Sequence, residues 1–161
     1  MDISLPVRII SASEPDDAIP QSIDETGIRR LVHGFYDAIR RDPLLGPIFD
    51  QAIAPERWPG HLEKMCAFWS SVLLKTRRYD GRPLPPHLAL ADLSDSHFQR
   101  WLELFRSTAG EVFDADGAAV IVSRAERIAH SFRLALSFHR GENTTTVMPL
   151  SSALKIGEDL P

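Results

Sequence analysis

A histidine that follows a cluster of prolines is the first feature of the sequence that could carry chemistry. In the stretch PLPPHLAL, residues 83–90, His87 is preceded by Pro83, Pro85 and Pro86. Proline fixes its own φ, lacks an amide donor and disfavours a helical residue before it, so the chain approaches His87 in an extended form. An imidazole held in one direction suits a metal or a cofactor. The same arrangement also suits an ordinary helix start with proline in its first turn.

A second histidine, His61, has apolar neighbours along a helix. The spacing i, i+4, i+7 and i+8 places three other side chains on the same face, namely Met65, Phe68 and Trp69. This face fits two interpretations equally well, a polar ring that opens an apolar wall and a histidine at the rim of a core stripe. Tyr36 has the same ambiguity, because it flanks an apolar stripe and a buried tyrosine hydroxyl usually finds a hydrogen-bond partner.

The motifs that define most enzyme classes are absent from the sequence. It has no HExxH, no CxxC pair, no GxGxxG, no GKS or GKT phosphate loop and no GxSxG elbow. The single cysteine, Cys66, cannot form an internal disulfide and agrees with a reducing compartment, where we expect it to be buried. The other histidines are expected to be structural or solvated; these are His33, His97, His130 and His139.

The composition fits one globular domain that binds neither nucleic acid nor membrane. The 161 residues are 43% hydrophobic and 25% charged, which allows a sizeable core. The formal net charge is −4 and the 18 Lys and Arg residues are scattered, so no concentrated positive surface is expected. No apolar run approaches the roughly 20 residues that cross a bilayer, and the start of the chain does not resemble an export signal. We therefore expect a cytoplasmic protein.

Apolar residues that recur every three and four positions predict an all-α domain over residues 22–140. Residues 1–21 and 141–161 lack this periodicity and are expected to be flexible tails. Inside the domain, only residues 75–91, which include His87, are expected to be irregular. The four substantial helices are expected at about 22–42, 56–74, 94–112 and 116–139.

Local signals predict how two of these helices begin. Ser22 and Glu25 have the spacing of a capping box for the first helix. Either Asp92 or Ser94 can cap the third. The segment LLGPIF, residues 44–49, contains glycine and proline and is expected to form a turn that presents its last two side chains inward.

Four segments of this chain resemble, in the same order and at similar spacing, the third group of truncated haemoglobins. The segments are FYDAIRRDPLLGPIF, WPGHLEKMCAFWSSVLL, YDGRPLPPHLAL and HFQRWLELF. The similarity extends over about residues 22–140, and neither tail takes part in it. The resemblance implies a truncated globin fold, which is a two-over-two helical sandwich around a haem pocket.

The resemblance also implies roles for individual residues. It implies that haem b, iron protoporphyrin IX, is bound with His87 as the proximal ligand and metal-binding residue. Three polar side chains would surround the opposite, distal face: Tyr36, His61 and Trp101. Four apolar side chains would contact the haem ring: Phe49, Met65, Phe68 and Trp69. Four side chains near the rim are candidates for the haem propionates: Lys64, Arg77, Arg78 and Tyr79.

The implied function is the binding of a diatomic gas, chiefly oxygen but also carbon monoxide or nitric oxide. One alternative is a haem enzyme, either a nitric oxide dioxygenase or a peroxidase-like protein, with a reductase as a further partner. The other alternative is a haem-free helical interaction module, because aromatic stripes are more often core than cofactor contacts. Haem uptake separates this module from the first two functions, and turnover with a reductant separates those two from each other.

Overall fold

Among the residues that the structure describes, the chain forms five α-helices and no strand. The structure is a computed structural model that describes residues 19–20, 22–83, 86–87, 90 and 93–150. The helices are α1 (Glu25–Arg41), α2 (Gly46–Ala52), α3 (Trp58–Leu74), α5 (Asp95–Val112) and α6 (Ala115–His139). Two short 3-10 helices complete the list, η2 (Pro55–Arg57) and η3 (Thr144–Thr146). The expected all-α class is confirmed.

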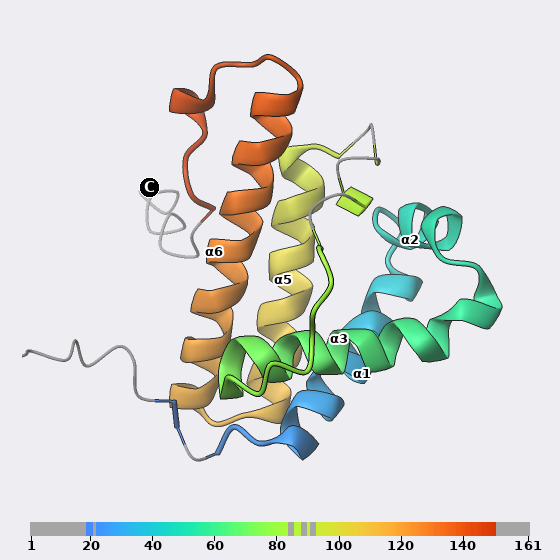
Figure 1. Cartoon of the computed structure of the whole chain (residues 1–161), viewed down its shortest axis with the longest axis vertical. Helices are drawn as coiled ribbons and strands as arrows, with labels where there is room; N and C mark the ends of the chain where they lie inside the picture. Colours follow the sequence, from blue (N-terminus) through green and yellow to red (C-terminus); the bar gives the residue numbers. More distant parts are fainter. Residues whose placement is uncertain (1–18, 21, 84–85, 88–89, 91–92, 151–161) are drawn as a thin grey trace, which may run out of the picture.

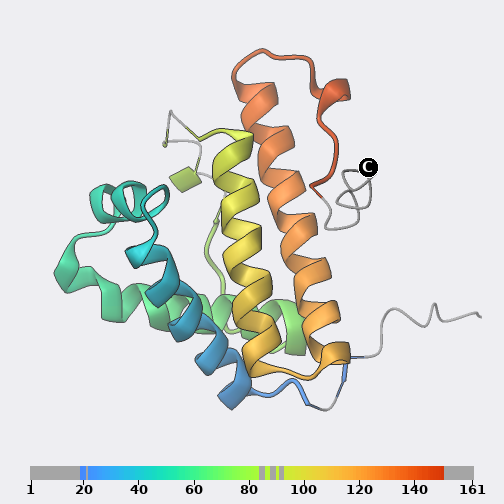
Figure 2. The ribbon, with the colours of Figure 1, turned by 180° about the vertical axis from the view of Figure 1, so that it is seen from behind.

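Two pairs of long helices cross each other. Helices α5 and α6 lie side by side along the length of the molecule, and α3 runs across them (Figure 1). From behind, α1 is seen to descend obliquely beside α5 (Figure 2). Helix α1 contacts α2, α3 and α5, so it joins the two pairs. This is the two-over-two sandwich expected of a truncated globin.

The core lies where the two pairs meet, and α1 supplies its central stripe. The residues of this stripe are at most 1% exposed, as the helical periodicity predicts: Ile28, Leu31, Val32, Phe35 and Ile39. Phe105 of α5 and Ile121 of α6 are completely buried opposite them. Burial of such side chains typically stabilises a protein by about 1.5–3 kcal/mol each, so this stripe fixes the position of α1. None of the helices in the described ranges is long and apolar enough to cross a membrane.

Helix α1 begins at Glu25 and is capped by Asp24, not by the expected Ser22. The Asp24 carboxylate accepts a hydrogen bond from the Gly27 amide at 2.8 Å. The Ser22 hydroxyl donates instead to the side chain of Asp114, at 3.3 Å. The expected capping box is therefore wrong, because a distant carboxylate takes the serine and a nearer one satisfies the helix start.

Helix α5 is capped by Ser94, one of the two expected residues. The Ser94 amide donates to Nδ1 of His97 at 3.0 Å, which completes a capping box with histidine in the usual place of glutamate. The alternative cap, Asp92, lies outside the described residues. His97, expected to be structural or solvated, thus has a capping role.

The segment LLGPIF is only in part the expected turn, because Leu44 and Leu45 are turn residues whereas Gly46 begins helix α2. Ile48 and Phe49 pack against the core, as expected. Its Pro47 lies in the first turn of α2, where the missing amide proton breaks no hydrogen bond. Just before it, the Asp42 carboxylate accepts hydrogen bonds from the amides of Leu44 and Leu45, at 3.1 and 3.0 Å. These bonds close a tight turn between α1 and α2. The turn therefore precedes the segment's glycine, and a short helix follows it.

Part of the predicted C-terminal tail lies along α6. Residues 141–150 include η3, and Leu150 packs against the core. Arg133 of α6 is only 6% exposed; its guanidinium donates to the Met148 carbonyl and to the Asp95 carboxylate at the start of α5. One buried arginine thus connects α6, α5 and the returning segment.

Asp42 joins α1, α2 and α5. Its side chain is 2% exposed and accepts from Nε of Arg100 at 2.7 Å as well as from the two amides. Burial alone would raise the pKa of this carboxyl. The hydrogen bond from the Leu45 amide, the Arg100 guanidinium and the hydrogen bond from the Leu44 amide together lower it more, so the pKa lies below its ordinary value. Because the folded pKa is depressed, this stabilisation is present above about pH 4 and is lost as the pH falls through the folded pKa.

We predict that Asp42→Asn lowers the free energy of unfolding by about 1–3 kcal/mol at pH 7, since an ionised, hydrogen-bonded acceptor is lost. Urea unfolding at pH 7 and at pH 3 measures the effect. The difference in the free energy of unfolding between wild type and variant should be smaller at the lower pH. Asp37→Asn is the control, because its exposed ion pair with Arg41 contributes under about 1 kcal/mol. An equal loss in both variants would contradict the role given to Asp42.

Candidate functional site

The imidazole of His87 is oriented by the backbone of the proline segment before it. Its Nδ1 lies 2.6 Å from the Pro83 carbonyl oxygen. A carbonyl can only accept, so Nδ1 carries the proton, and a neutral ring then has its lone pair on Nε2. Burial lowers the pKa of His87 and outweighs the opposite effect of this hydrogen bond, which favours the neutral ring. Metal-binding histidines commonly have this tautomer and this kind of support.

The structure around His87 agrees with both interpretations of the proline cluster, a ring held in one direction and a helix start with proline in its first turn. Pro86 and His87 have helical backbone, and the Leu90 amide donates to the His87 carbonyl at 3.1 Å. A proline in the first turn of a short helical segment therefore coexists with a fixed imidazole. The ring packs on Phe132 of α6, with centroids 4.6 Å apart. Pro85, which precedes Pro86 in the sequence, lies outside the described residues.

His61 of α3 has a buried ring nitrogen without a hydrogen-bond partner. Its Nε2 has no acceptor or donor among the described residues. The ring stands edge-on to Tyr36 and Trp58, with centroids 5.1 and 5.4 Å away. Burial lowers the pKa of His61, and the charges of Lys64 and His87 lower it further. His61 is thus a mostly neutral imidazole on the side of α3 toward His87, with one polar atom left unsatisfied.

The Tyr36 hydroxyl is a second buried polar group near His61. Tyr36 is 7% exposed, and no hydrogen bond of its hydroxyl occurs within the described part of the chain. Burial raises the pKa of Tyr36 far above its usual range, so the hydroxyl keeps its proton. Aromatic rings surround it, including Phe49 at 6.0 Å and Trp58 at 5.9 Å between centroids. Leaving the nearby Nε2 of His61 unpaired costs about 1–3 kcal/mol, which indicates a site for a polar ligand.

Trp101 of α5 joins this cluster through the core. Its ring lies edge-on to Phe35, 5.3 Å between centroids, and Phe35 in turn contacts Tyr36 at 5.1 Å. On its other side Trp101 stacks on Phe105 at 5.4 Å, and Phe105 contacts Trp69 at 5.0 Å. Trp101 is only partly buried. These ring contacts hold Trp101 against Phe35 and Phe105.

The apolar residues expected to contact haem lie on α2 and α3. Phe49, Met65 and Phe68 are half-buried and pack against the core, whereas Trp69 is 3% exposed. Phe68 contacts Trp69 at 5.4 Å, edge to face. Partial exposure of the first three leaves them able to cover a flat apolar ligand. Trp69 is held more deeply by the core.

The four candidates for the propionates lie in different surroundings. Lys64 is exposed and close enough to lower the pKa of His61, so it lies on the same side of α3. Arg77 is exposed, with a left-handed φ of 58°. Arg78 turns toward α1 and donates to Glu25 at 2.9 Å. Tyr79 packs its ring on Phe68, 5.3 Å between centroids. Only Lys64 and Tyr79 are thus tied by contacts or charge to the residues around His61.

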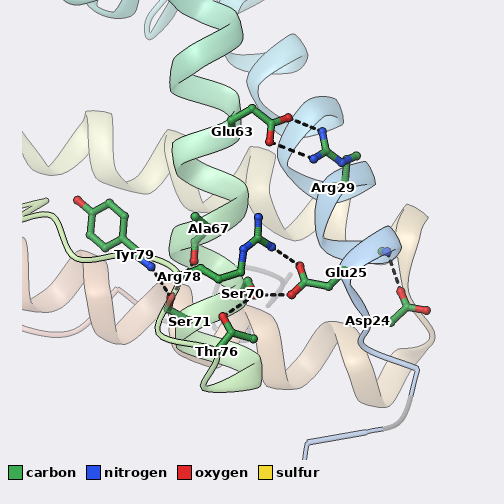
Figure 3. A network of polar contacts seen from close by, with 11 residues as sticks. Asp24, Glu25, Arg29, Glu63, Ala67, Ser70, Ser71, Thr76, Arg78 and Tyr79 are labelled. Atoms are coloured by element: carbon green, nitrogen blue, oxygen red, sulfur yellow. Dashed lines mark hydrogen bonds and ion pairs between the residues drawn. The ribbon is translucent and has the colours of Figure 1, made fainter.

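A polar network holds the loop that carries Tyr79 (Figure 3). The buried Ser70 hydroxyl donates to Glu25 at 2.5 Å and lies 2.8 Å from the Thr76 hydroxyl. One residue on, the Ser71 hydroxyl accepts from the Tyr79 amide at 2.9 Å and donates to a carbonyl of the preceding helical turn. The chain leaves α3 at Lys75, which has a left-handed φ of 56°. The network thus turns the chain back along α3 and places the Tyr79 ring against it.

Two residues of the site are not marked as such by the sequence. Trp58 lies between Tyr36 and His61, and Phe132 supports the His87 ring. The only sequence signal for Trp58 was its position three residues before His61 on one helix face. Phe132 gave no signal, because its contact with His87 joins segments 45 residues apart.

The donor set fits haem better than a metal site built by side chains alone. No group of three His, Cys, Asp or Glu side chains gathers among the described residues. One imidazole cannot complete a metal's coordination, but a porphyrin brings four nitrogens and needs only an axial ligand. His87 would supply that ligand, and the buried Nε2 of His61 is an unsatisfied polar atom among aromatic rings.

The helical architecture and the anchored imidazole define a small globin. No family model matches the chain. The chain is 36% identical over 115 residues to group 3 truncated hemoglobin ctb of Campylobacter jejuni, covering 70% of this chain and 91% of the relative. The crystal structure of a group III truncated hemoglobin from Campylobacter jejuni matches it with a TM-score of 0.69 at 36% identity, over 74% of this chain and 95% of that one. The protein belongs to the group 3 truncated haemoglobins, a family of globin haem proteins.

Ser71→Ala should release the loop that carries Tyr79, because the Tyr79 amide loses its acceptor. We predict that exchange of the Tyr79 amide hydrogen becomes about tenfold faster, as expected for the loss of one hydrogen bond. Hydrogen exchange followed by NMR measures this rate. Ser107→Ala, at an exposed position of α5, should leave it unchanged. Unchanged exchange in Ser71→Ala would show that the ring contact with Phe68 alone holds the loop.

Proposed function

We propose that the protein binds haem b through Nε2 of His87 and holds a diatomic gas, oxygen foremost, on the side of Tyr36 and His61. The observation that carries the proposal is the buried Nε2 of His61, which has no hydrogen-bond partner and lies beside the Tyr36 ring, together with an imidazole, His87, whose Nδ1 is already bonded. Membership of the family supports the haem. Ferrous haem supplies an open coordination position for the gas.

The proximal role of His87 follows from its fixed tautomer. With Nδ1 donating to the Pro83 carbonyl, Nε2 is free to coordinate a metal, and the neutral ring does not have to lose a proton first. Phe132 supports one face of the ring and limits its rotation. The chain thus presents a prepared ligand from a short segment and needs no long helix to position it.

Tyr36 and His61 are the proposed hydrogen-bond donors to the gas. The raised pKa of Tyr36 keeps a proton on its hydroxyl, and a neutral His61 has one N–H to donate. Oxygen acquires partial negative charge on binding to ferrous iron, so a donor that is already buried and oriented stabilises it. Each hydrogen bond would contribute about 1–3 kcal/mol in such a dry surrounding. Trp101 is the proposed third donor.

At the rim, we propose that Lys64 and Tyr79 interact with the haem propionates. Lys64 brings a positive charge on the His61 side of α3, and Tyr79 is held over α3 by the network of Figure 3. Arg77 is a further candidate, because its side chain is exposed and forms no ion pair in the described ranges. Arg78 is already committed to Glu25, so its contribution would require breaking that pair.

His87→Ala should abolish the normal haem spectrum of the purified protein. The wild type is expected to show an intense Soret band that shifts with carbon monoxide in the ferrous form. The variant should bind haem more weakly and lose this ferrous spectrum, because the axial ligand is gone. His139→Ala removes an exposed imidazole at the end of α6 and serves as the matched control. If His87→Ala keeps the wild-type ferrous spectrum, His87 is not the ligand.

Tyr36→Phe should raise the oxygen dissociation rate about ten- to hundredfold, since a buried donor is lost while the ring remains. Stopped-flow displacement of oxygen by carbon monoxide measures this rate. Tyr79→Phe removes the chain's other tyrosine hydroxyl and should change it less than about twofold. A slower or unchanged rate in Tyr36→Phe would mean that His61 or Trp101 carries the stabilisation.

A further inference from the structure

A cavity of about 350 Å³ opens between α1 and the N-terminal half of α3. At its mouth lie His33, Asp37 and Arg40, three exposed residues of α1. Its inner wall is formed by Tyr36 and Trp58, both of which are buried. The helix pair that forms this cavity is seen crossing in Figure 1 and Figure 2. None of the roles assigned above uses its outer part.

The inner wall of the cavity is also the wall of the distal pocket. Tyr36 and Trp58 each contact the His61 ring edge-on, and they contact one another at 5.9 Å between centroids. The His61 ring, whose Nε2 is unsatisfied, therefore lies in direct contact with two residues of the cavity lining. A small molecule in the cavity already meets Tyr36, and one that displaced the Trp58 ring would reach the His61 ring without moving a helix.

Arg40 closes this wall from outside. Its guanidinium carbon lies 4.6 Å from the centroid of the Trp58 ring, which is a cation–π contact. No carboxylate pairs with Arg40 in the described ranges, and the nearby Asp37 is bonded to Arg41. An exposed cation–π contact is weak, and exposed side chains change rotamer within nanoseconds. The contact can therefore hold Trp58 on average and still open often.

We propose that this cavity is an access route through which a small uncharged diatomic ligand reaches the distal pocket, with Trp58 as its inner barrier and Arg40 as the latch on that barrier. The proposal rests on the proposed function, because it needs a gas ligand at the haem. It adds to that function a path for the gas and two residues, Trp58 and Arg40, that control the rates of ligand binding and release. A barrier on the path is crossed in both directions, so its removal changes association and dissociation by the same factor and leaves the equilibrium constant unaltered. Loss of a distal donor instead alters dissociation and affinity.

The test uses the full-length haem-loaded protein: carbon monoxide rebinding after flash photolysis gives the association rate, and displacement of bound carbon monoxide by nitric oxide gives the dissociation rate. Arg40→Met removes the latch and keeps the length of the side chain; association and dissociation should both become about two- to fivefold faster. Arg41→Met, one residue away and outside the cavity, is the matched control and should change neither rate. Leu62→Trp fills the cavity from α3 and should slow both rates about tenfold, with an unchanged equilibrium constant. Arg30→Trp adds the same bulk at an exposed position of α1 away from the cavity and is its control.

The outcomes separate this proposal from the one on which it rests. If the wild type shows no carbon monoxide spectrum at all, the proposed function fails. If the spectrum is normal and Leu62→Trp and Arg40→Met both leave the rates unaltered, the access route is overturned. Faster rebinding in His61→Ala together with unchanged rates in those two variants would show that the ligand passes His61 instead. Should Leu62→Trp not fold, Arg40→Met against Arg41→Met still decides, since both positions are exposed.

Discussion

The site depends on one hydrogen bond, from Nδ1 of His87 to the carbonyl of Pro83. It fixes both the tautomer and the direction of the ring, because a carbonyl can only accept and the proline fixes its own φ. An imidazole without that bond could present either nitrogen. Under the proposed function, His87 is the residue that would hold the iron, so the direction of its ring matters for haem binding. The proline segment would then serve to present one oriented ring.

Helix α1 fixes the direction of the Tyr36 side chain, as the Pro83 carbonyl fixes the direction of the His87 ring. Phe35 faces the core, and its neighbour Tyr36 faces the pocket, so the rigidity of the core is transmitted to the hydroxyl. Phe35 also contacts Trp101, which places two proposed donors against one buried ring. At the end of the helix, Asp42 fixes the start of α2, which carries Phe49. It does so by accepting hydrogen bonds from two backbone amides and by an ion pair with Arg100 of α5. The distal pocket is thus positioned by groups that are themselves outside it.

Periodicity sufficed to predict the long helices, because burial of one face depends on spacing within each helix. It also marked Tyr36 and His61 as residues at the edge of such a face. Features that depend on distant partners were not accessible in this way. The expected capping of α1 by Ser22 is wrong because the Ser22 hydroxyl donates its hydrogen bond to Asp114, 92 residues away. Likewise, the helical start of LLGPIF needs the buried Asp42, whose charge is kept by Arg100, and the direction of Arg78 is set by Glu25.

The polar groups around His61 place function and stability in opposition. The buried Nε2 of His61, which has no hydrogen-bond partner, costs free energy that a leucine at the same position would not. The surrounding rings prevent water from relieving this cost easily, and they also keep the local dielectric low, which strengthens any hydrogen bond that a ligand accepts. The same burial that lowers the pKa of His61 and raises that of Tyr36 therefore keeps both groups neutral and ready to donate. Such a pocket is less stable when empty than an apolar one, and it regains that free energy when a polar ligand is bound.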